Sequence, residues 1–392
     1  MKTNWNFAVV AAALLLVGAP TAVPAQEVVK VGVVLPLTGP FTSTGRQILG
    51  GIQTYLKEHG DAVAGKKIEL VVKDDAGTAD QTRRIAQELV ANEGVKILGG
   101  FGLTPLALAA APVATRAKVP MVVMGGAASI VTEASPYVVR TSFTQASSPD
   151  VAAGWMVKNG IKTAVTFVSD FAPGHETEAI FSGRFEKDGG KVIEKIRIPL
   201  QSPDFAPFLQ RARDAKPEAI FVFVPAGQAS TLFKQYGERG LKDAGIQLFG
   251  AGDITDDDVL DNMGDSALGI VTAHQYSAAH PSALNKTFVK TFIDNAKIRP
   301  NFFGVAGYDG MALIAKALAK TKGDLDGTKL VEAMKGEVWE SPRGPMSIDP
   351  QTRDVVNNVY IRKVEKVGSQ YWNVEFETIE NVRDPIKAAK GK

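Results

Sequence analysis

Two kinds of hydrophobic pattern alternate along the chain from residue 28 onward. Short runs rich in β-branched residues are typical of buried strands, and longer segments with apolar residues three or four positions apart are typical of helices. The first part of the chain shows strand patterns at 28–35, 67–73, 95–98 and 121–124 and helix patterns at 48–59, 79–92 and 106–116. Because strand and helix alternate, we expect a parallel sheet covered by helices on both faces.

A second run of the same kind begins near Pro149. Strand patterns follow at 164–168, 191–199, 219–224, 247–249 and 270–273, and helix patterns at 176–187, 205–215, 229–239 and 302–319. Each run has the size of one small doubly wound α/β domain. No Pro-rich or Ser-rich tract separates the two runs, so we expect two domains joined by several short crossings rather than by one tether.

The first 25 residues have the features of a signal peptide. Lys2 supplies a positive charge, and residues 7–17 form a short apolar run. Val23 and Ala25 then occupy the −3 and −1 positions of a suitable cleavage site. The alternative is a membrane anchor, but the run is shorter than the roughly 20 residues that span a bilayer. We predict cleavage between Ala25 and Gln26 and a soluble protein in the bacterial periplasm.

Composition excludes several classes of function. The 392 residues contain no Cys, which rules out disulfides, Cys-ligated zinc, iron–sulfur clusters, thiol catalysis and lipid attachment through Cys. The formal net charge is only +2, so the chain lacks the excess of basic residues that is typical of nucleic-acid-binding proteins.

The common catalytic and cofactor motifs are also missing. The sequence has no G-x-S-x-G elbow, Walker A motif or HExxH motif, and Pro105 interrupts the only candidate for a dinucleotide-binding loop. His274 and His280 are six residues apart, which does not suit one helical face, and we assign them to a polar loop. The acids at 256–258 could bind a cation, but we expect Thr255 to cap a helix whose first turn holds them. We therefore predict no cofactor, no metal and no catalytic residue.

The segment 97–111 carries the most informative chemistry. A strand ends in glycines, and Thr104 and Pro105 then suit the N-cap and the first position of an apolar helix. Free amide groups at such a helix start can bind an anion, although an ordinary capped helix has the same pattern. The next strand also runs into small residues, at 125–129. Two adjacent loops of this kind indicate a site for a carboxylate or a similar small anion.

The second half of the chain has loops of the same type after its strands, at 168–174, 224–228 and 250–254. Ligands of open α/β sheets bind outside the carboxyl ends of the strands. If the two domains face each other, the ligand lies between them.

The segments 30–53, 73–122 and 308–318 resemble bacterial periplasmic leucine/isoleucine/valine-binding proteins, and the resemblance covers essentially the whole mature chain. It implies the type I periplasmic-binding-protein fold, in which three crossings join two α/β lobes that close on a ligand. Lobe one would comprise 28–145 with 277–343, and lobe two 146–276 with 344–392. The resemblance also implies a monomeric solute-binding subunit of an ABC importer that docks on a permease in the inner membrane.

The family's ligand positions can be placed on this sequence. Those expected to contact ligand are Thr44, Phe101, Gly102, Leu103, Thr104, Gly125, Gly126, Ala127, Phe171, Pro173, Pro225, Gly252, Asp253 and Phe303. Thr104 replaces the Ser that holds the ligand carboxylate, and Ala127 replaces a Thr that binds both carboxylate and ammonium. Pro173 and Pro225 stand where leucine binders have Tyr, and Gly252 stands where they have the Glu that pairs with the ammonium.

The anion half of the site is thus retained, and the ammonium half is weakened. Burying an unpaired ammonium is costly, so the pattern favours an aromatic acid of the benzoate or phenylpropanoid type. Phe41, Tyr276 and Phe302 could add to an aromatic wall, and the segment 274–288 is similar to relatives that bind lignin-derived aromatic acids.

The sequence is also compatible with three other functions. If Asp253 or Asp170 pairs with an ammonium, the ligand is a branched-chain or other amino acid, or an amide. The same fold also serves in ligand-sensing modules, which would require a separate signalling partner. A periplasmic enzyme is the third alternative, but it would lack a nucleophile elbow, a metal cluster and a His-centred triad.

Overall fold

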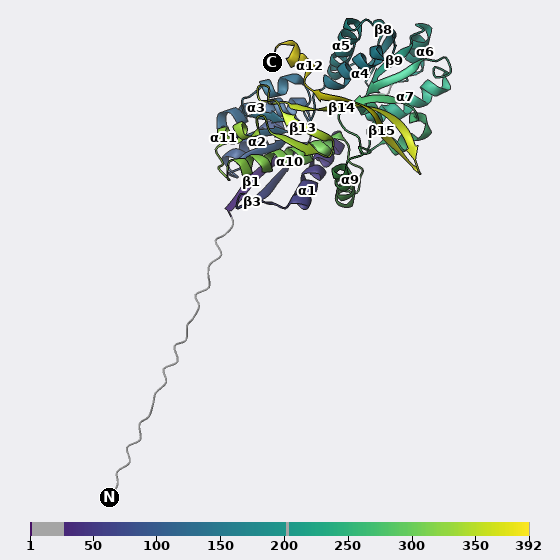
Figure 1. Cartoon of the computed structure of the whole chain (residues 1–392). Coiled ribbons are helices and arrows are strands. Elements are labelled where there is room, and N and C mark those ends of the chain that lie inside the picture. The colour runs from purple at the N-terminus through teal and green to yellow at the C-terminus, as the bar shows by residue number, and fades with distance from the viewer. Residues whose placement is uncertain (2–26, 201–203, 392) are drawn as a thin grey trace.

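The computed structural model describes residues 1, 27–200 and 204–391, and it shows two α/β lobes side by side (Figure 1). The predicted signal peptide and its cleavage site lie outside the described residues, apart from Met1. The long strands β14 and β15 extend across the junction between the lobes (Figure 1).

The first lobe is built on a six-stranded sheet with the order β2-β3-β1-β4-β5-β6, parallel except for β2. Its strands are β1 Glu27–Leu35, β2 Ala62–Val63, β3 Lys66–Asp74, β4 Ile97–Gly100, β5 Met121–Val123 and β6 Val138–Arg140. Its helices are α1 Thr42–His59, α2 Ala79–Ala91, α3 Thr104–Ala117, η1 Ser129–Glu133, α9 Ala283–Ala296, α10 Phe302–Lys320 and α11 Gly327–Met334.

The second sheet has nine strands. Its parallel part has the order β11-β10-β9-β7-β8, with β7 Thr163–Ser169, β8 Lys191–Ile198, β9 Ala219–Phe223, β10 Gln247–Ala251 and β11 Val271–His274. An antiparallel extension adds β12 Val338–Ser341, β13 Gly344–Ile348, β14 Val355–Val367 and β15 Gln370–Val382. The helices are α4 Ser147–Lys158, α5 Ala172–Lys187, α6 Ala206–Asp214, α7 Ala226–Glu238, η2 Gly252–Thr255, α8 Leu260–Met263, η3 Gly264–Ala267 and α12 Pro385–Ala389.

The two parallel sheets share one strand order. β1 lies between β3 and β4, and β7 lies in the same way between β8 and β9. At such a point the connections leave on opposite faces of the sheet and open a crevice at the carboxyl ends of the strands. The loops after β1 and β4 and those after β7 and β9 are therefore the places where each lobe can hold a ligand.

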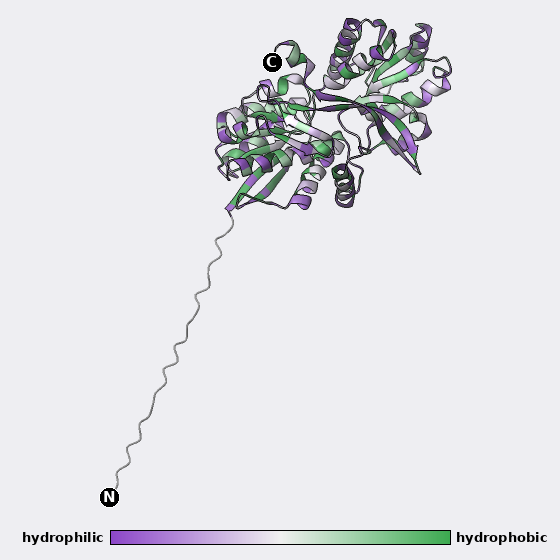
Figure 2. Ribbon diagram, viewed as in Figure 1, coloured by the Kyte–Doolittle hydropathy of each residue, from purple (hydrophilic) through white to green (hydrophobic). Residues whose placement is uncertain are grey.

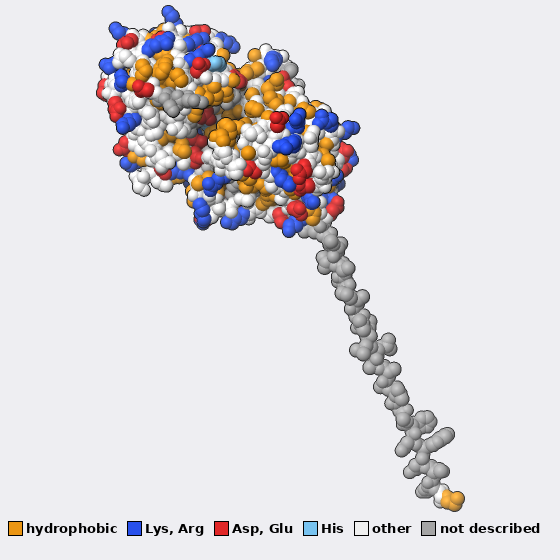
Figure 3. Space-filling view, turned by 180° about the vertical axis from the view of Figure 1, so that it is seen from behind, with side chains coloured by type: hydrophobic (Ala, Val, Ile, Leu, Met, Phe, Trp, Pro, Cys, Tyr) orange, Lys and Arg blue, Asp and Glu red, His pale blue; other side chains and the backbone are white. Residues whose placement is uncertain are grey.

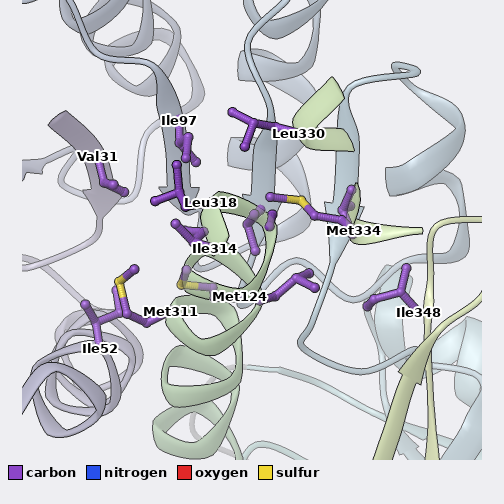
Figure 4. Close-up of a cluster of buried hydrophobic side chains, with 14 of the residues drawn as sticks. Val31, Ile52, Ile97, Met124, Met311, Ile314, Leu318, Leu330, Met334 and Ile348 are labelled. Carbon is purple, nitrogen blue, oxygen red and sulfur yellow. The ribbon is translucent and has the colours of Figure 1, made fainter. Parts of the chain in front are cut away.

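Apolar strands and one long helix make the core of the first lobe. Val31 and Ile97 of the sheet pack with Met311, Ile314 and Leu318 of α10 (Figure 4). Among the described residues, α10 is the one helix long and apolar enough to cross a membrane, but 83% of its apolar window is buried inside the protein. Hydrophobic residues dominate the inner strands of both lobes (Figure 2), as expected for parallel sheets covered on both faces.

The fold confirms the predicted α/β architecture of two doubly wound lobes. The antiparallel strands β12 to β15 are not among the predicted elements. The predicted helix over the acids at 256–258 is wrong, since the helix there ends at Thr255 and the acids lie in the following turn. The division of the chain at 145, 276 and 343 stays a prediction.

Candidate ligand-binding site

A sharp turn after β4 places the start of α3 at the crevice. Gly100 and Phe101 have positive φ values of 105° and 61°, which turn the chain from the strand into the helix. Helix α3 begins at Thr104, one residue earlier than predicted, and Leu103 takes the N-cap position without a side-chain bond. The Thr104 hydroxyl instead accepts a hydrogen bond from the Ala128 amide at 3.1 Å. Its own hydrogen remains available to donate to a ligand oxygen.

Glycines allow the loops of the first lobe to touch. A Cβ on Gly102 would lie 3.2 Å from Thr44 Cγ2, and one on Gly125 would lie 2.5 Å from the Gly102 backbone. A Cβ on Gly126 would lie 3.2 Å from the Leu103 carbonyl. The structure thus brings Thr44, in the first turn of α1, together with the predicted positions in the loops after β4 and β5.

Arg140 fixes the direction of the loop after β5. Its guanidinium is fully buried and donates to the Ala128 carbonyl at 2.8 Å and the Gly126 carbonyl at 3.4 Å. In a trans peptide unit the N–H points opposite to the C=O. The amides of Ala127 and Ser129 therefore point away from Arg140, and within the described chain they have no hydrogen-bond partner.

Ser129 adds a second hydroxyl at this loop. Its side chain is buried, and its Oγ has no hydrogen-bond partner among the described residues. Ser129 Oγ, the amides of Ala127 and Ser129 and the hydroxyl of Thr104 are all hydrogen-bond donors, which suits an anion. Sequence reasoning placed Ser129 in the loop but did not assign it to the ligand.

In the second lobe, two prolines open the helices at the crevice. Pro173 lies in the first turn of α5, whose N-cap is Phe171, and Pro225 is the N-cap of α7. The ring of Phe171 stacks on Phe223 with centroids 6.2 Å apart and an interplanar angle of 15°. These residues give the second lobe an apolar rim at its switch point.

The structure gives a steric reason for a glycine at position 252. A Cβ there would lie 2.0 Å from Cδ2 of His274, which is fully buried at the end of β11. Burial, followed by the charges of Arg362 and Arg343, holds the pKa of His274 well below its usual value. A neutral imidazole thus occupies the place that a larger residue at 252 would need, and the assignment of His274 to a polar loop is wrong.

Aromatic rings connect His274 to the first lobe. Phe302 lies 4.7 Å from His274, 5.1 Å from Phe143 and 4.2 Å from Phe303, measured between ring centroids. Ala127 packs against this group of rings and belongs to residues 125–129, which we call the anion loop. Hydrophobic side chains also gather where the two lobes meet when the molecule is seen from behind (Figure 3).

Three of the predicted wall residues are either fully buried or exposed. Phe101 and Tyr276 are fully buried in the core, so their rings pack in the interior. Phe41 is 41% exposed and would contact a Cβ on Gly77. Phe303 and Phe171 are both partly exposed, and their contact with a ligand stays a prediction.

A family model described as a periplasmic binding protein matches residues 28–369. The chain belongs to this family. A Leu/Ile/Val-binding protein homolog from Brucella melitensis is 42% identical over 92% of this chain and 93% of its own length. A solute-binding protein of an ABC transporter from Rhodopseudomonas palustris BisB5, solved with 3,4-dihydroxybenzoic acid, is 57% identical with a TM-score of 0.86, over 92% of this chain and 99% of that one. Another from R. palustris, solved with 4-hydroxybenzoate, is 39% identical with a TM-score of 0.84, over 91% and 98%. The family consists of transport binding proteins rather than enzymes, and this chain is accordingly the solute-binding component of an ABC transporter.

The aspartates near the site of this periplasmic binding protein differ in their exposure and in their hydrogen-bond partners. The Asp170 carboxylate contacts His175 at 2.6 Å on the exposed surface. Asp256 accepts from Asn301 at the start of α10, at 3.0 Å. Asp253 is half-buried, and no other residue donates a hydrogen bond to its carboxylate within the described chain. Burial raises the pKa of Asp253 to about 6, and Arg362 opposes that rise.

Proposed function

We propose that this periplasmic binding protein captures an aromatic carboxylate between its lobes for import. One observation carries the proposal: the anion donors are present, while His274 fills the place where an acid at position 252 would pair with an ammonium. The two relatives from R. palustris bound to hydroxylated benzoates support the same ligand class.

In this proposal the ligand carboxylate binds the amides of Ala127 and Ser129 and the hydroxyl of Thr104. Its ring lies against Phe303 and Phe171, and Pro173 and Pro225 close over it from the second lobe. Thr44, Gly102, Leu103, Gly125 and Gly126 shape the carboxylate end. Binding would shift the two lobes from an open toward a closed arrangement.

Asp253 would accept a hydrogen bond from a ring hydroxyl. We expect Asp253→Asn to weaken 4-hydroxybenzoate binding about 10-fold, since a hydrogen bond to a charged group contributes about 1.5–3 kcal/mol. Benzoate, which lacks the hydroxyl, should change by less than about 3-fold on the same scale. Isothermal titration calorimetry with both acids checks this, and equal losses for the two ligands would contradict the assignment.

The same contact should depend on pH. The carboxylate form of Asp253 accepts a stronger hydrogen bond than the protonated form, and its pKa is about 6. The preference for 4-hydroxybenzoate over benzoate should therefore rise between pH 5 and pH 7 and then level off. The ratio of the two Kd values removes effects common to both acids, including those of Asp256 and Arg362. In Asp253→Asn the ratio should stay constant over this range.

Amino-acid binding is the main alternative, since the Brucella homolog carries a Leu/Ile/Val-binding name. We expect benzoates and phenylpropanoid acids to raise the melting temperature, because a ligand that binds only the native state stabilises it. Leucine, isoleucine, valine and simple amides should give no shift. A shift with leucine alone would overturn the proposed ligand class and would point to Asp253 as an ammonium partner.

Further features of the function belong to the same proposal. We infer export to the periplasm with cleavage between Ala25 and Gln26, a monomer in solution, and docking of the closed form on an inner-membrane permease. Lobe one would comprise 28–145 with 277–343, and lobe two the remainder from 146. No residue would act in catalysis, and no cofactor would be required. A ligand-sensing role would instead require a separate signalling protein as partner.

A further inference from the structure

A buried network of four charges lies behind the anion loop. Arg140 Nε donates to Asp354 Oδ1 at 2.7 Å, and Arg140 Nη2 lies 3.6 Å from Asp384 Oδ2. The Nζ of Lys387 contacts the other oxygen of Asp354 and the hydroxyl of Thr132. All four charged side chains are at most 3% exposed, and their charges sum to zero.

The two ends of the network belong to different parts of the fold. At one end Arg140 holds the Gly126 and Ala128 carbonyls of the anion loop. At the other end Asp384 caps the C-terminal helix α12, accepting from the amides of Ile386 and Lys387, and Lys387 lies within that helix. Figure 1 places α12 at the end of the chain, beside the junction of the lobes.

Helix α12 also faces the second lobe, where Ile386 lines one cavity together with Ile180 of α5. Glu176 of α5 lies one turn after Pro173, and the negative charge of Asp384 acts on its carboxyl group. Burial is the first cause that raises the pKa of Glu176, and Asp384 adds to it. The network thus contacts the loop at 126–128 in the first lobe, and its charge acts on α5 of the second lobe.

The energetics of buried ions explain why one partner matters to the others. A buried ion pair adds little net stability, but removing one partner leaves an uncompensated charge and costs several kcal/mol. Without Lys387, two carboxylates would face one guanidinium in the interior. Arg140 would then be drawn toward Asp354 and Asp384 and away from the two carbonyls that it holds.

We infer that α12 is part of the ligand site: through Lys387, Asp354 and Arg140 it positions the anion loop so that the Ala127 and Ser129 amides face the ligand. Lys387 and Arg140 are positioning residues, since neither is expected to touch the ligand. The link to ligand affinity rests on the proposed function, and the link to loop geometry does not.

The test compares Lys387→Met with Arg353→Met in the full chain without its signal peptide. Arg353 holds the carbonyls of Thr132, Ser135 and Val138, which lie next to the network, but its side chain makes no hydrogen bond to residues 125–128. We expect both variants to melt at lower temperature. Only Lys387→Met should raise the Kd for 4-hydroxybenzoate, by at least 10-fold, measured well below both melting temperatures.

Amide hydrogen exchange of the ligand-free protein gives a second measurement. The amides of Gly126 and Ala128 are bonded to Phe101 and Thr104 in the intact loop. They should exchange at least 10-fold faster in Lys387→Met and at the native rate in Arg353→Met. Lys387→Gln, which keeps a polar group but removes the charge, should show the same change and serves if the Met variant does not fold.

The outcomes separate the two proposals. Native exchange at both amides in Lys387→Met and Lys387→Gln would overturn the positioning role, as would equal acceleration in Arg353→Met. If the intact protein binds no aromatic acid, the proposed function fails, and exchange at the two amides still decides the role of α12.

Discussion

Gly125→Ala is expected to abolish useful ligand binding, raising the Kd by at least about 100-fold, or about 2.8 kcal/mol. The new Cβ would lie 2.5 Å from the Cα and carbonyl oxygen of Gly102. Because these are backbone atoms, they cannot rotate away, and the loops after β4 and β5 must separate. The donors on the two loops would then no longer converge on one carboxylate. Calorimetric titration with 4-hydroxybenzoate measures the loss.

Gly183→Ala is the matched control for this prediction. Gly183 lies inside α5, and a Cβ there would meet nothing within 4 Å. Since Ala favours a helix more than Gly does by about 1 kcal/mol, the melting temperature should rise slightly and the Kd should not change. A Gly125→Ala protein that is folded and binds with the native Kd would show that the two loops do not form one site.

Thr104→Val has the second largest expected effect. Valine keeps the shape but removes the hydroxyl, which accepts from Ala128 at 3.1 Å and which we propose donates to the ligand. Leaving buried polar groups unpaired costs about 1–3 kcal/mol, which corresponds to about 5-fold to 150-fold in Kd. The measurement is calorimetric titration with benzoate, which tests the carboxylate end alone.

Thr115→Val tests whether such a loss is specific to the site. Thr115 lies in the same helix, and its hydroxyl bonds the Ala111 carbonyl at 3.0 Å and Ser135 at 2.7 Å. This variant should melt at lower temperature and bind benzoate normally. If Thr104→Val binds as tightly as the native protein, the anion site does not involve α3.

The local parts of this structure could be predicted from the sequence. Hydrophobic runs located β1, β3, β4 and β5 of the first sheet and the five parallel strands of the second, but not β6. The small residues at 100–104 and 125–129 marked the loops of the proposed anion site. Each of these features depends on neighbours within a few residues. The start of α3 was missed by one residue because the Thr104 hydroxyl bonds Ala128 rather than the helix amides.

The parts that could not be predicted depend on contacts between distant residues. His274 excludes a larger residue at Gly252, 22 positions earlier, and no local pattern indicates that β10 and β11 bring the two together. In the sequence, nothing distinguishes Arg140 from an ordinary surface charge, because its partners Asp354 and Asp384 lie beside it only in the folded chain. Phe101 has a residue type that suits a pocket wall, but the positive φ of the turn after β4 directs it into the core.

The shared strand order of the two sheets has a consequence for how ligand preference can change. In the proposed site, the first lobe would supply the amides and hydroxyls for a carboxylate, a group found in amino acids and aromatic acids alike. In the proposed site, the rest of the ligand would contact Phe303 of the first lobe and five positions of the second lobe, Phe171, Pro173, Pro225, Gly252 and Asp253. Because each lobe has its own sheet and its own crevice, substitutions in the second lobe can exchange one acid for another while the capture of the carboxylate is left intact.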